Sequence, residues 1–168
     1  QRVCVVGAGS WGTTIAALAS HNAHTMLWSR RAELAEEINS LHTNSAYLGA
    51  MVLPDALHAS SDLQTALMQA DVVAMAVPSQ GFHDVAGEVS KYVRSGVPVI
   101  SLSKGLEQGT FLRMSEVIEQ VMPNNPVAVL SGPNLAKEIL AGQPAASVIA
   151  CTDESVARGL LEIFSRPT

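Results

Sequence analysis

The sequence predicts an α/β fold, a doubly wound and mostly parallel sheet with helices on both faces. Strand-like and helix-like segments alternate along the whole chain, which is the pattern that parallel sheets with helical crossovers produce. The 168 residues suffice for one domain with a sizeable core. Their composition, 48% hydrophobic but only 4% aromatic, suits an α/β core rich in Ala, Val and Leu more than an all-β sandwich.

The first segment carries the most specific motif. Residues 3–6 are a short apolar run of the kind found in buried parallel strands, and helical spacing of apolar residues follows over 13–19. Between them lies a Gly-x-Gly-x-x-Gly motif at Gly7, Gly9 and Gly12. In a strand–turn–helix setting the first glycine makes the tight turn, the second admits a pyrophosphate, and the third allows close helix packing. A dinucleotide site of the Rossmann type is therefore expected, with a ligand-free glycine-rich turn as the alternative.

The segments up to residue 60 continue the alternation. Residues 24–28 are predicted to form a second strand, and residues 31–41 a helix whose apolar side chains share one face. Residues 43–56 have no clear period and contain Asn, Gly and Pro, so an irregular loop is expected there. A short strand over 57–59 follows.

The rest of the chain repeats the pattern. An apolar run over 71–77, ended by Pro78, predicts a central strand. Thr110 can cap a helix and precedes apolar residues at helical spacing, so a helix over 110–121 with Phe111 in its buried stripe is expected. The other expected elements are, in order, a helix opened by Ser61 or Asp62, a helix over 81–93, strands over 98–102 and 127–130, a short helix over 134–140, a strand over 145–150 and a helix over 153–164.

Sheets of this kind bind ligands outside the carboxyl ends of the strands, where the strand order reverses. Five segments follow predicted strands and are expected to meet in one cleft: 7–12, 29–31, 78–82, 103–105 and 131–134. Pro78 is accordingly placed with the cofactor-binding residues. The rings of Trp28 and Phe82 either pack on a ring of the cofactor or belong to the core.

The end of the second strand normally distinguishes the two nicotinamide dinucleotides. An acidic residue about 20 positions beyond the glycine motif would bind the ribose 2′-hydroxyl of NAD, whereas arginine accommodates the 2′-phosphate of NADP. Here Arg30 and Arg31 follow the strand, with no acidic residue before Glu33. Charge-assisted contacts from two guanidinium groups favour NADP over NAD. The alternative is a solvated basic pair, which the partial positive charge of a helix N-terminus disfavours.

Two later strand ends carry residues suited to a polar ligand. Lys104 follows its strand directly and could orient a carbonyl or phosphate oxygen, with an ordinary lysine in a surface turn as the alternative. Gly132 would admit a ligand to the backbone. Asn134 could either hydrogen-bond a substrate or cap the helix that follows it.

Charge and residue spacing exclude several other classes. The net charge of -5 gives no general attraction to nucleic acid or anionic membranes. No apolar run approaches the ~20 residues that cross a bilayer, and no signal peptide is expected before the first strand. Cys4 and Cys151 are expected to be buried thiols rather than a disulfide, which fits a cytoplasmic location. The five histidines lack the spacing of a metal site or a catalytic triad, so no metal is expected.

Several segments together resemble one family. They are Gly-Ala-Gly-Ser-Trp-Gly-Thr at 7–13, Leu-Trp-Ser-Arg at 27–30, Ala-Val-Pro-Ser-Gln at 76–80, Ser-Lys-Gly at 103–105 and Ser-Gly-Pro-Asn-Leu-Ala-Lys-Glu at 131–138. This combination runs along essentially the whole chain and is similar to bacterial NAD(P)-dependent glycerol-3-phosphate dehydrogenases. The resemblance implies an oxidoreductase that interconverts dihydroxyacetone phosphate and sn-glycerol 3-phosphate and so feeds glycerophospholipid synthesis.

The resemblance also assigns roles to residues. It implies that Ser10 and Trp11 contact the cofactor pyrophosphate, that Arg30 with Arg31 meets the adenosine ribose or its 2′-phosphate, that Lys104 touches cofactor and substrate, that Gly132 and Asn134 touch the substrate, and that Ala136 touches the cofactor. Asn134 stands where relatives vary among small polar residues.

The family has a second, all-helical domain that holds its acid/base lysine and its substrate-phosphate residues. Residues 1–168 are therefore expected to be the cofactor domain alone, with no catalytic residue in it and with the missing domain and a second copy of the full-length chain as partners. Lys137 is assigned to the short helix and not to the role of that lysine.

Two rival functions remain at this stage. One is a dinucleotide-sensing module without enzymatic activity. The other is a different two-domain dehydrogenase, of the 6-phosphogluconate or 3-hydroxyacyl-CoA type; the Ser-Gly-Pro-Asn segment and Arg30 argue against the latter.

Overall fold

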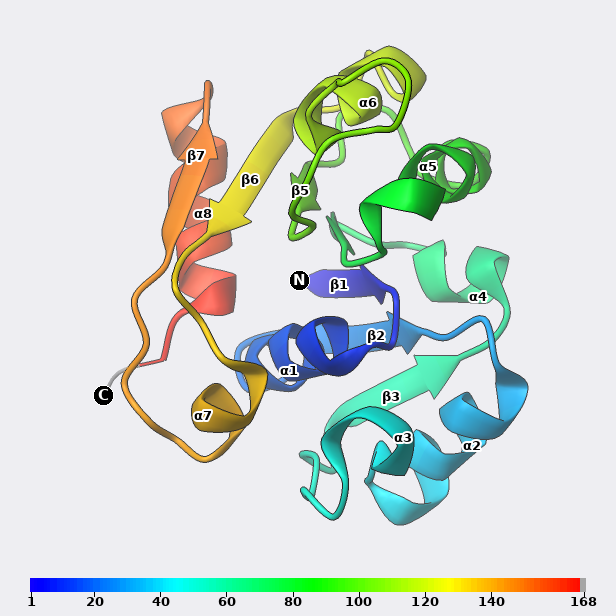
Figure 1. Ribbon diagram of the computed structural model, residues 1–168, viewed down its shortest axis with the longest axis vertical. Coiled ribbons are helices and arrows are strands. Elements are labelled where there is room, and N and C mark those ends of the chain that lie inside the picture. Colours follow the sequence, from blue (N-terminus) through cyan, green and yellow to red (C-terminus); the bar gives the residue numbers. More distant parts are fainter. Residues whose placement is uncertain (167–168) are drawn as a thin grey trace.

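The computed structural model describes residues 1–166 and contains one sheet with helices on both of its faces (Figure 1). The strands are β1 (Arg2–Val6), β2 (His24–Trp28), β3 (Leu57–Ser60), β4 (Val72–Met75), β5 (Val99–Ser101), β6 (Val127–Ser131) and β7 (Val148–Cys151). The helices are α1 (Ser10–Ala19), α2 (Ala32–Leu41), α3 (Ser45–Leu48), α4 (Leu63–Leu67), the 3-10 helix η1 (Ser79–Gly81), α5 (Phe82–Ser90), α6 (Met114–Val121), α7 (Ala136–Leu140) and α8 (Glu154–Phe164).

The sheet has the order β3-β2-β1-β4-β5-β6-β7. Every neighbouring pair from β3 to β6 is parallel, and β7 alone runs antiparallel, beside β6. The chain moves outward from β1 through β2 to β3, and then returns to place β4 on the other side of β1. This reversal puts the topological switch point at the carboxyl ends of β1 and β4. The predicted doubly wound, mostly parallel sheet is confirmed.

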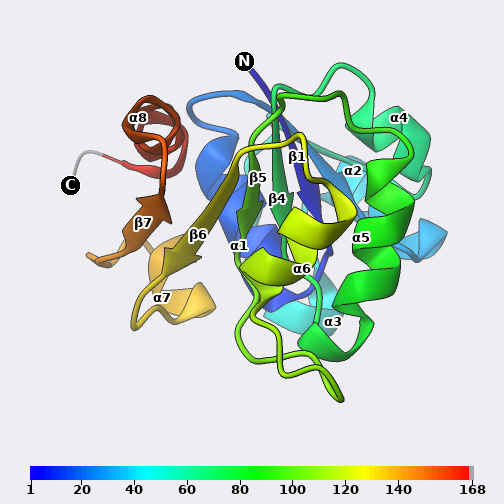
Figure 2. The ribbon, with the colours of Figure 1, turned by 90° about the horizontal axis from the view of Figure 1, so that it is seen from above.

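Successive residues of the central strand face opposite helical layers. Val3 and Val5 pack with α1, α2 and α8, whereas Cys4 and Val6 pack with α4, α5 and α6. Figure 2 shows α1 and α5 on opposite sides of β1 and β4. Both cysteines are free thiols, as predicted, and burial raises the pKa of Cys4 to about 12. Cys151 is only partly buried.

Aspartate side chains begin two of the helices. The Asp62 carboxylate accepts the backbone N–H groups of the first turn of α4, and the Asp153 carboxylate does the same for α8. A side-chain hydrogen bond from Thr65 and one from Ser155 lower the pKa values of these two carboxyl groups. Of the two residues expected to open α4, the structure selects Asp62.

The prediction that Thr110 begins a helix is wrong. Its hydroxyl donates to the Glu107 carboxylate, and the backbone N–H of Glu107 donates to the Leu112 carbonyl at 2.9 Å. The chain therefore makes a tight hairpin before α6, which starts only at Met114. Phe111 lies in this hairpin with a φ of 59° and is 74% exposed, so it is not part of the buried stripe.

Other predicted elements differ in extent. Residues 43–56 are not wholly irregular, because α3 forms within them. The helix expected over 81–93 ends at Ser90, and Tyr92 is exposed. The strand expected to begin at residue 145 begins at Val148, after an exposed loop. Within residues 1–166 no helix is long and apolar enough to cross a bilayer.

Two glycines allow α1 to begin against the sheet. Gly7 has a φ of +113°, and a Cβ there would lie 2.6 Å from the Ala76 carbonyl oxygen. A Cβ on Gly12 would lie 1.9 Å from the Gly7 carbonyl oxygen and 3.0 Å from Ala76 Cβ. Neither neighbour is a flexible side chain that could move aside. The turn, α1 and the end of β4 are thus in direct backbone contact.

We expect Gly12→Ala to destabilise the protein by about 3 kcal/mol or more, because its methyl group must displace backbone in a packed core. Gly159→Ala in α8 is the matched control, since a Cβ there meets nothing within 4 Å. The control should stabilise the protein by about 0.5–1 kcal/mol. Urea unfolding of both variants measures the difference, and a Gly12→Ala protein as stable as the parent chain would contradict this packing.

Candidate functional site

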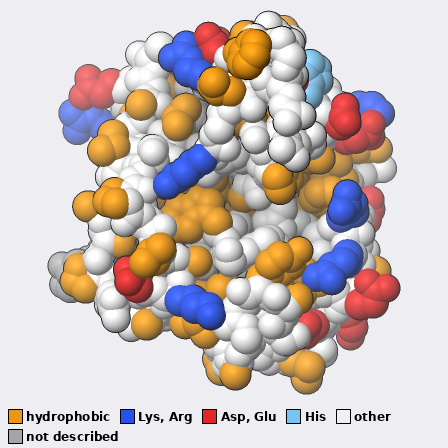
Figure 3. All heavy atoms as spheres, in the orientation of Figure 1, with side chains coloured by type: hydrophobic (Ala, Val, Ile, Leu, Met, Phe, Trp, Pro, Cys, Tyr) orange, Lys and Arg blue, Asp and Glu red, His pale blue; other side chains and the backbone are white. Residues whose placement is uncertain are grey.

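A cleft of about 930 Å³ lies at the carboxyl ends of the parallel strands. Figure 3 shows the hollow, with hydrophobic side chains on its floor and Lys and Arg side chains around it. All five segments that were expected to converge contribute to its lining, among them Gly7, Gly9, Ser10, Trp11, Gly12, Arg30, Arg31, Pro78, Lys104, Gly132, Asn134 and Ala136. The structure therefore brings every predicted site residue to one place.

The N-terminus of α1 opens onto this cleft without a side-chain cap. Gly9 is its N-cap residue, and no side chain accepts a hydrogen bond from the first turn. Asp62 and Asp153 provide such a cap for α4 and α8, whereas α2, α3, α5 and α7, like α1, have none. A Cβ on Gly9 would meet nothing within 4 Å, in contrast to Gly7 and Gly12. The first turn is thus accessible to an anion, and Gly9 faces open space.

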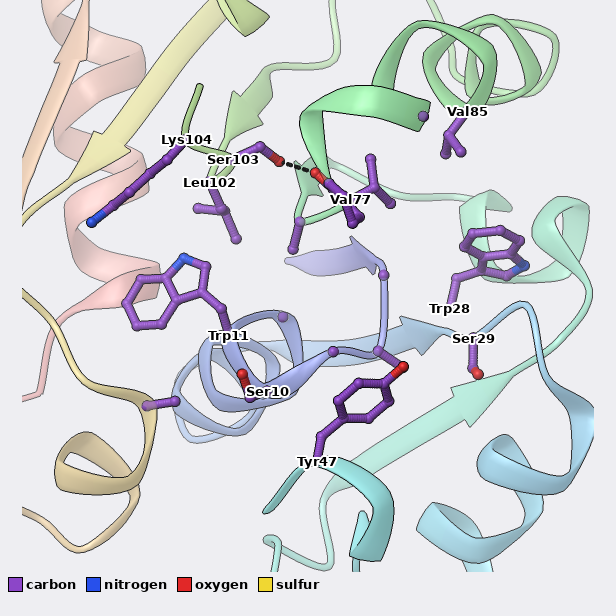
Figure 4. Close-up of a pocket in the computed structure, with 18 of the residues that line it drawn as sticks. Ser10, Trp11, Trp28, Ser29, Tyr47, Val77, Val85, Leu102, Ser103 and Lys104 are labelled. Atoms are coloured by element: carbon purple, nitrogen blue, oxygen red, sulfur yellow. Dashed lines mark hydrogen bonds between the residues drawn. The ribbon is translucent and has the colours of Figure 1, made fainter. Parts of the chain in front are cut away.

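Trp11 and Lys104 mark one end of the cleft (Figure 4). Lys104 comes from the loop after β5, and its Nζ donates to the Gly132 carbonyl oxygen at 3.3 Å. The hydroxyl of Ser103 donates to the Val77 carbonyl oxygen at 2.6 Å. These two bonds join the loops that follow β4, β5 and β6, and they place Lys104 beside Gly132.

Arginine and aromatic side chains occupy the other end. Trp28 and Ser29 lie there in Figure 4, and Arg30 and Arg31 line the same end after β2. The Trp28 indole N–H donates to the Ser61 carbonyl oxygen at 3.2 Å, which holds the ring at the cleft wall. Of the two rings considered, Trp28 thus lines the cleft, whereas Phe82 is fully buried in the core.

Tyr47 is a lining residue that sequence reasoning missed. It lies on α3, in the segment predicted to be an irregular loop, and it is 49% exposed. The Arg31 guanidinium lies over its ring, 5.7 Å from the centroid. No strand end or motif precedes Tyr47 in the sequence, so the pattern used to find the other residues could not include it.

The charges that line the cleft have one sign. Arg30, Arg31 and Lys104 belong to the lining, and no aspartate or glutamate among the described residues does. None of the three takes part in an ion pair within residues 1–166. Cations without neighbouring carboxylates favour a ligand that carries several negative charges, such as a phosphorylated molecule.

Asn134 does not cap α7, so that alternative is wrong. The N-cap of α7 is Leu135 and has no side-chain cap. The Asn134 side-chain amide instead donates to Ser147 Oγ at 2.7 Å, while its Oδ1 has no hydrogen-bond partner although it is buried. A Cβ on Gly132 would lie 2.5 Å from the Ala146 carbonyl oxygen. This glycine is therefore required by the packing of the two chain segments, whatever it also does for a ligand.

Among the described residues, neither a metal-binding group nor a histidine is found at the cleft. The described residues contain no group of three or more His, Cys, Asp or Glu residues that could hold a metal ion. None of the histidines among them lines the cleft. Lys104, Arg30 and Arg31 are the charged groups of the lining, and such cations bind anions.

Known proteins are similar to this chain along almost its whole length. The family described as "NAD-dependent glycerol-3-phosphate dehydrogenase N-terminus" matches residues 2–157. A glycerol-3-phosphate dehydrogenase (NAD(P)+) of Sphingopyxis alaskensis is 52% identical over 163 residues, which are 97% of this chain and 49% of that protein. One from Mycobacterium tuberculosis is 49% identical over 164 residues, 97% of this chain and 48% of that protein. The chain spans about half the length of these curated relatives.

Comparison with solved structures points to the same family. The crystal structure of glycerol-3-phosphate dehydrogenase from Coxiella burnetii matches with a TM-score of 0.91 and 30% identity, over 99% of this chain and 51% of that chain. A pyrroline-5-carboxylate reductase from Coxiella burnetii, 15% identical with a TM-score of 0.71 over 96% of this chain and 54% of that chain, shares the fold alone. The chain belongs to the NAD-dependent glycerol-3-phosphate dehydrogenase family and corresponds to its N-terminal domain.

Proposed function

We propose that this chain is the cofactor-binding domain of an oxidoreductase that interconverts dihydroxyacetone phosphate and sn-glycerol 3-phosphate. One observation carries the proposal: the uncapped N-terminus of α1 opens, beside Gly9, onto a cleft lined by cations. No aspartate or glutamate within residues 1–166 lines this cleft. The enzyme names of the relatives support the choice of substrate. Supply of glycerophospholipid synthesis, a cytoplasmic location and a homodimer of the full-length chain are predictions that follow from the family resemblance.

The residues around the cleft fit a nicotinamide dinucleotide. Ser10 and Trp11, in the first turn of α1, would meet its pyrophosphate, because this turn leaves its N–H groups accessible. Pro78 and Ala136 would border the same cofactor from the loops after β4 and β6. When bound in the reduced form, the nicotinamide supplies a hydride. The chain's own residues hold and orient the reactants.

The end of the cleft that holds Trp28, Arg30 and Arg31 would take the adenosine part of the cofactor, and its side chains favour NADP over NAD. Arg30 is exposed at this end and has no ion-pair partner within the described chain. Arg31 lies over Tyr47, and the two side chains form a wall beside it. A guanidinium that is not neutralised by a carboxylate can make a bidentate contact with a 2′-phosphate.

Lys104, Gly132 and Asn134 supply one wall of the substrate site. The Lys104 ammonium would polarise a substrate oxygen, and the unpartnered buried Oδ1 of Asn134 could accept a hydrogen bond from a substrate hydroxyl. Reduction of a ketone requires a group that delivers a proton. Within residues 1–166, no His, Asp or Glu lines the cleft to do so. We assign that proton transfer, and the clamp on the substrate phosphate, to a helical domain of the longer protein.

The lack of a described His, Asp or Glu in the cleft also favours a second candidate, a module that binds a dinucleotide and regulates a partner. Sequence of the parent gene beyond Thr168 separates the two. A Lys-Asn pair soon after residue 168, and an Arg-Asn pair further on in a helical region, would support the dehydrogenase.

Gly9→Val should abolish dinucleotide binding and leave the fold intact. The valine side chain would extend into the open space beside Gly9, where the pyrophosphate is proposed to lie, and the extended backbone there tolerates a Cβ. Isothermal titration calorimetry with NADPH measures the affinity, and urea unfolding checks the fold. Gly87→Val, at a second open position away from the cleft, is the control. Unchanged affinity in Gly9→Val would remove the motif from the cofactor site.

Arg30→Asp should weaken NADPH binding more than NADH binding, by about 1.5–3 kcal/mol for the lost charge-assisted contact. Arg158→Asp makes the same charge change on α8, where Arg158 pairs only with Glu154 within the described chain, and should affect both cofactors equally. Titration of each variant with the two cofactors gives the difference. Equal losses in Arg30→Asp would assign this arginine to a general phosphate or adenine contact.

Residues 1–168 alone should show no appreciable dehydrogenase turnover with dihydroxyacetone phosphate. A positioned acid typically contributes about 10²–10⁴-fold, and this chain supplies only one wall of the substrate site. Adding the second half of the protein, covalently or in trans, should restore activity.

In the complete enzyme Lys104→Ala should then reduce kcat/KM sharply. Lys91→Ala, which removes an exposed lysine paired with Glu88 on α5, should not. Rapid NADPH oxidation by residues 1–168 alone would overturn the two-domain mechanism.

A further inference from the structure

Asn44 holds the phosphate-binding turn from its buried side. The residue is fully buried, and it does not line the cleft. Its Nδ2 donates to the Ala8 carbonyl oxygen at 3.0 Å and to the Thr13 hydroxyl oxygen at 2.8 Å. One amide group thus joins the turn between the first two glycines to the first turns of α1, from a position more than 30 residues away in the sequence.

Asn44 does not cap the helix that it begins, although an asparagine at this position normally does. Asn44 is the N-cap residue of α3, and asparagine is among the residues preferred at that position. Its side chain nevertheless makes no cap hydrogen bond. Its Oδ1 remains buried without a partner, which has a free-energy cost. The Asn44 side chain is therefore used to contact the turn and not to cap α3.

Glu37 on α2 keeps the Asn44 segment in place. Its carboxylate accepts the Ser45 backbone N–H at 2.6 Å and the Thr43 hydroxyl at 2.9 Å, on the two sides of Asn44. The hydrogen bond from the Ser45 backbone is the main reason that the pKa of Glu37 is lowered. The cap that Asn44 does not provide for α3 is thus provided by Glu37.

The contact with Ala8 determines the direction of one peptide group. The Ala8 carbonyl and the Gly9 N–H belong to the same trans peptide, in which the two groups point in opposite directions. Holding the Ala8 oxygen against Asn44, on the buried side, directs the Gly9 N–H away from that side. Gly9 lines the cleft, and Asn44 does not.

We infer that Asn44 is a positioning residue for dinucleotide binding, which fixes the Ala8–Gly9 peptide so that the turn presents its N–H groups to the ligand phosphates. The inference rests on the proposed function, because it needs a dinucleotide in the cleft. It adds a residue outside the glycine motif and outside the cleft lining to the machinery that binds it.

The test compares Asn44→Leu with Asn125→Leu in residues 1–168. Asn125 is the matched control, since its Nδ2 also donates to two carbonyl oxygens, those of Arg94 and Val97, both at 2.8 Å, but away from the cleft. Both variants should lower the urea midpoint. Only Asn44→Leu should weaken NADP+ binding in calorimetry, by about tenfold for two lost hydrogen bonds. Binding by Asn44→Leu within twofold of the parent chain would overturn the inference.

Two further variants cover the case in which Asn44→Leu does not fold. Thr13→Val preserves shape and removes one acceptor of the Asn44 amide, and it should weaken NADP+ about threefold. Asn44→Asp preserves shape and places an ionisable carboxyl group against the Ala8 oxygen. When protonated, that carboxyl group has one O–H and can donate one of the two hydrogen bonds that the amide makes. Its affinity relative to the parent chain should therefore rise between pH 8 and pH 5.5; a flat ratio would overturn the inference.

The parent chain and Gly9→Val are titrated alongside these variants. If the parent chain itself does not bind NADP+, the proposed function fails. If the parent chain binds, Gly9→Val does not, and Asn44→Leu binds normally, the proposed function stands and the role of Asn44 alone is refuted.

Discussion

The backbone contact between Gly12 and the Gly7 carbonyl is the constraint on which the rest of the structure depends. A Cβ on Gly12 would lie 1.9 Å from that oxygen, and a Cβ on Gly7 would lie 2.6 Å from the Ala76 oxygen at the end of β4. Strand β1, helix α1 and strand β4 can meet this closely only because these two side chains are absent. The contact forces α1 to begin at the carboxyl edge of the sheet, where the strand order reverses.

The chemistry of the cleft follows from that placement. Asp62 and Asp153 neutralise the N-termini of α4 and α8, whereas the N-terminus of α1 has no such partner and opens onto the cleft. Arg30, Arg31 and Lys104 add positive charge without a described carboxylate among the lining residues. The backbone partial charge and the side-chain charges have the same sign, so they act together on an anionic ligand. This field favours a ligand that carries several negative charges.

Sequence reasoning succeeded where a local pattern has one physical meaning. The apolar run before Gly7 predicted β1. The segments after five of the predicted strands were found together because carboxyl ends of parallel strands share an edge. It failed where a polar side chain had two possible partners. Thr110 and Asn134 can both cap helices, but Glu107 and Ser147, respectively, bind them instead. Those partners are close in space for reasons that helical propensity does not contain.

The sequence by itself determined the doubly wound sheet, the glycine turn and the cationic segments that follow the strands, since each depends on short-range periodicity or on backbone sterics. Only the tertiary structure decided which residues support that turn and complete its cleft. Tyr47 and Asn44 come from a segment without periodicity, and they act through contacts with Arg31 and Ala8. Such contacts form because the segment that holds Asn44 and Tyr47 lies against the loops that follow β1 and β2. A chain read in order carries no local signal of which distant backbone group a buried amide will meet.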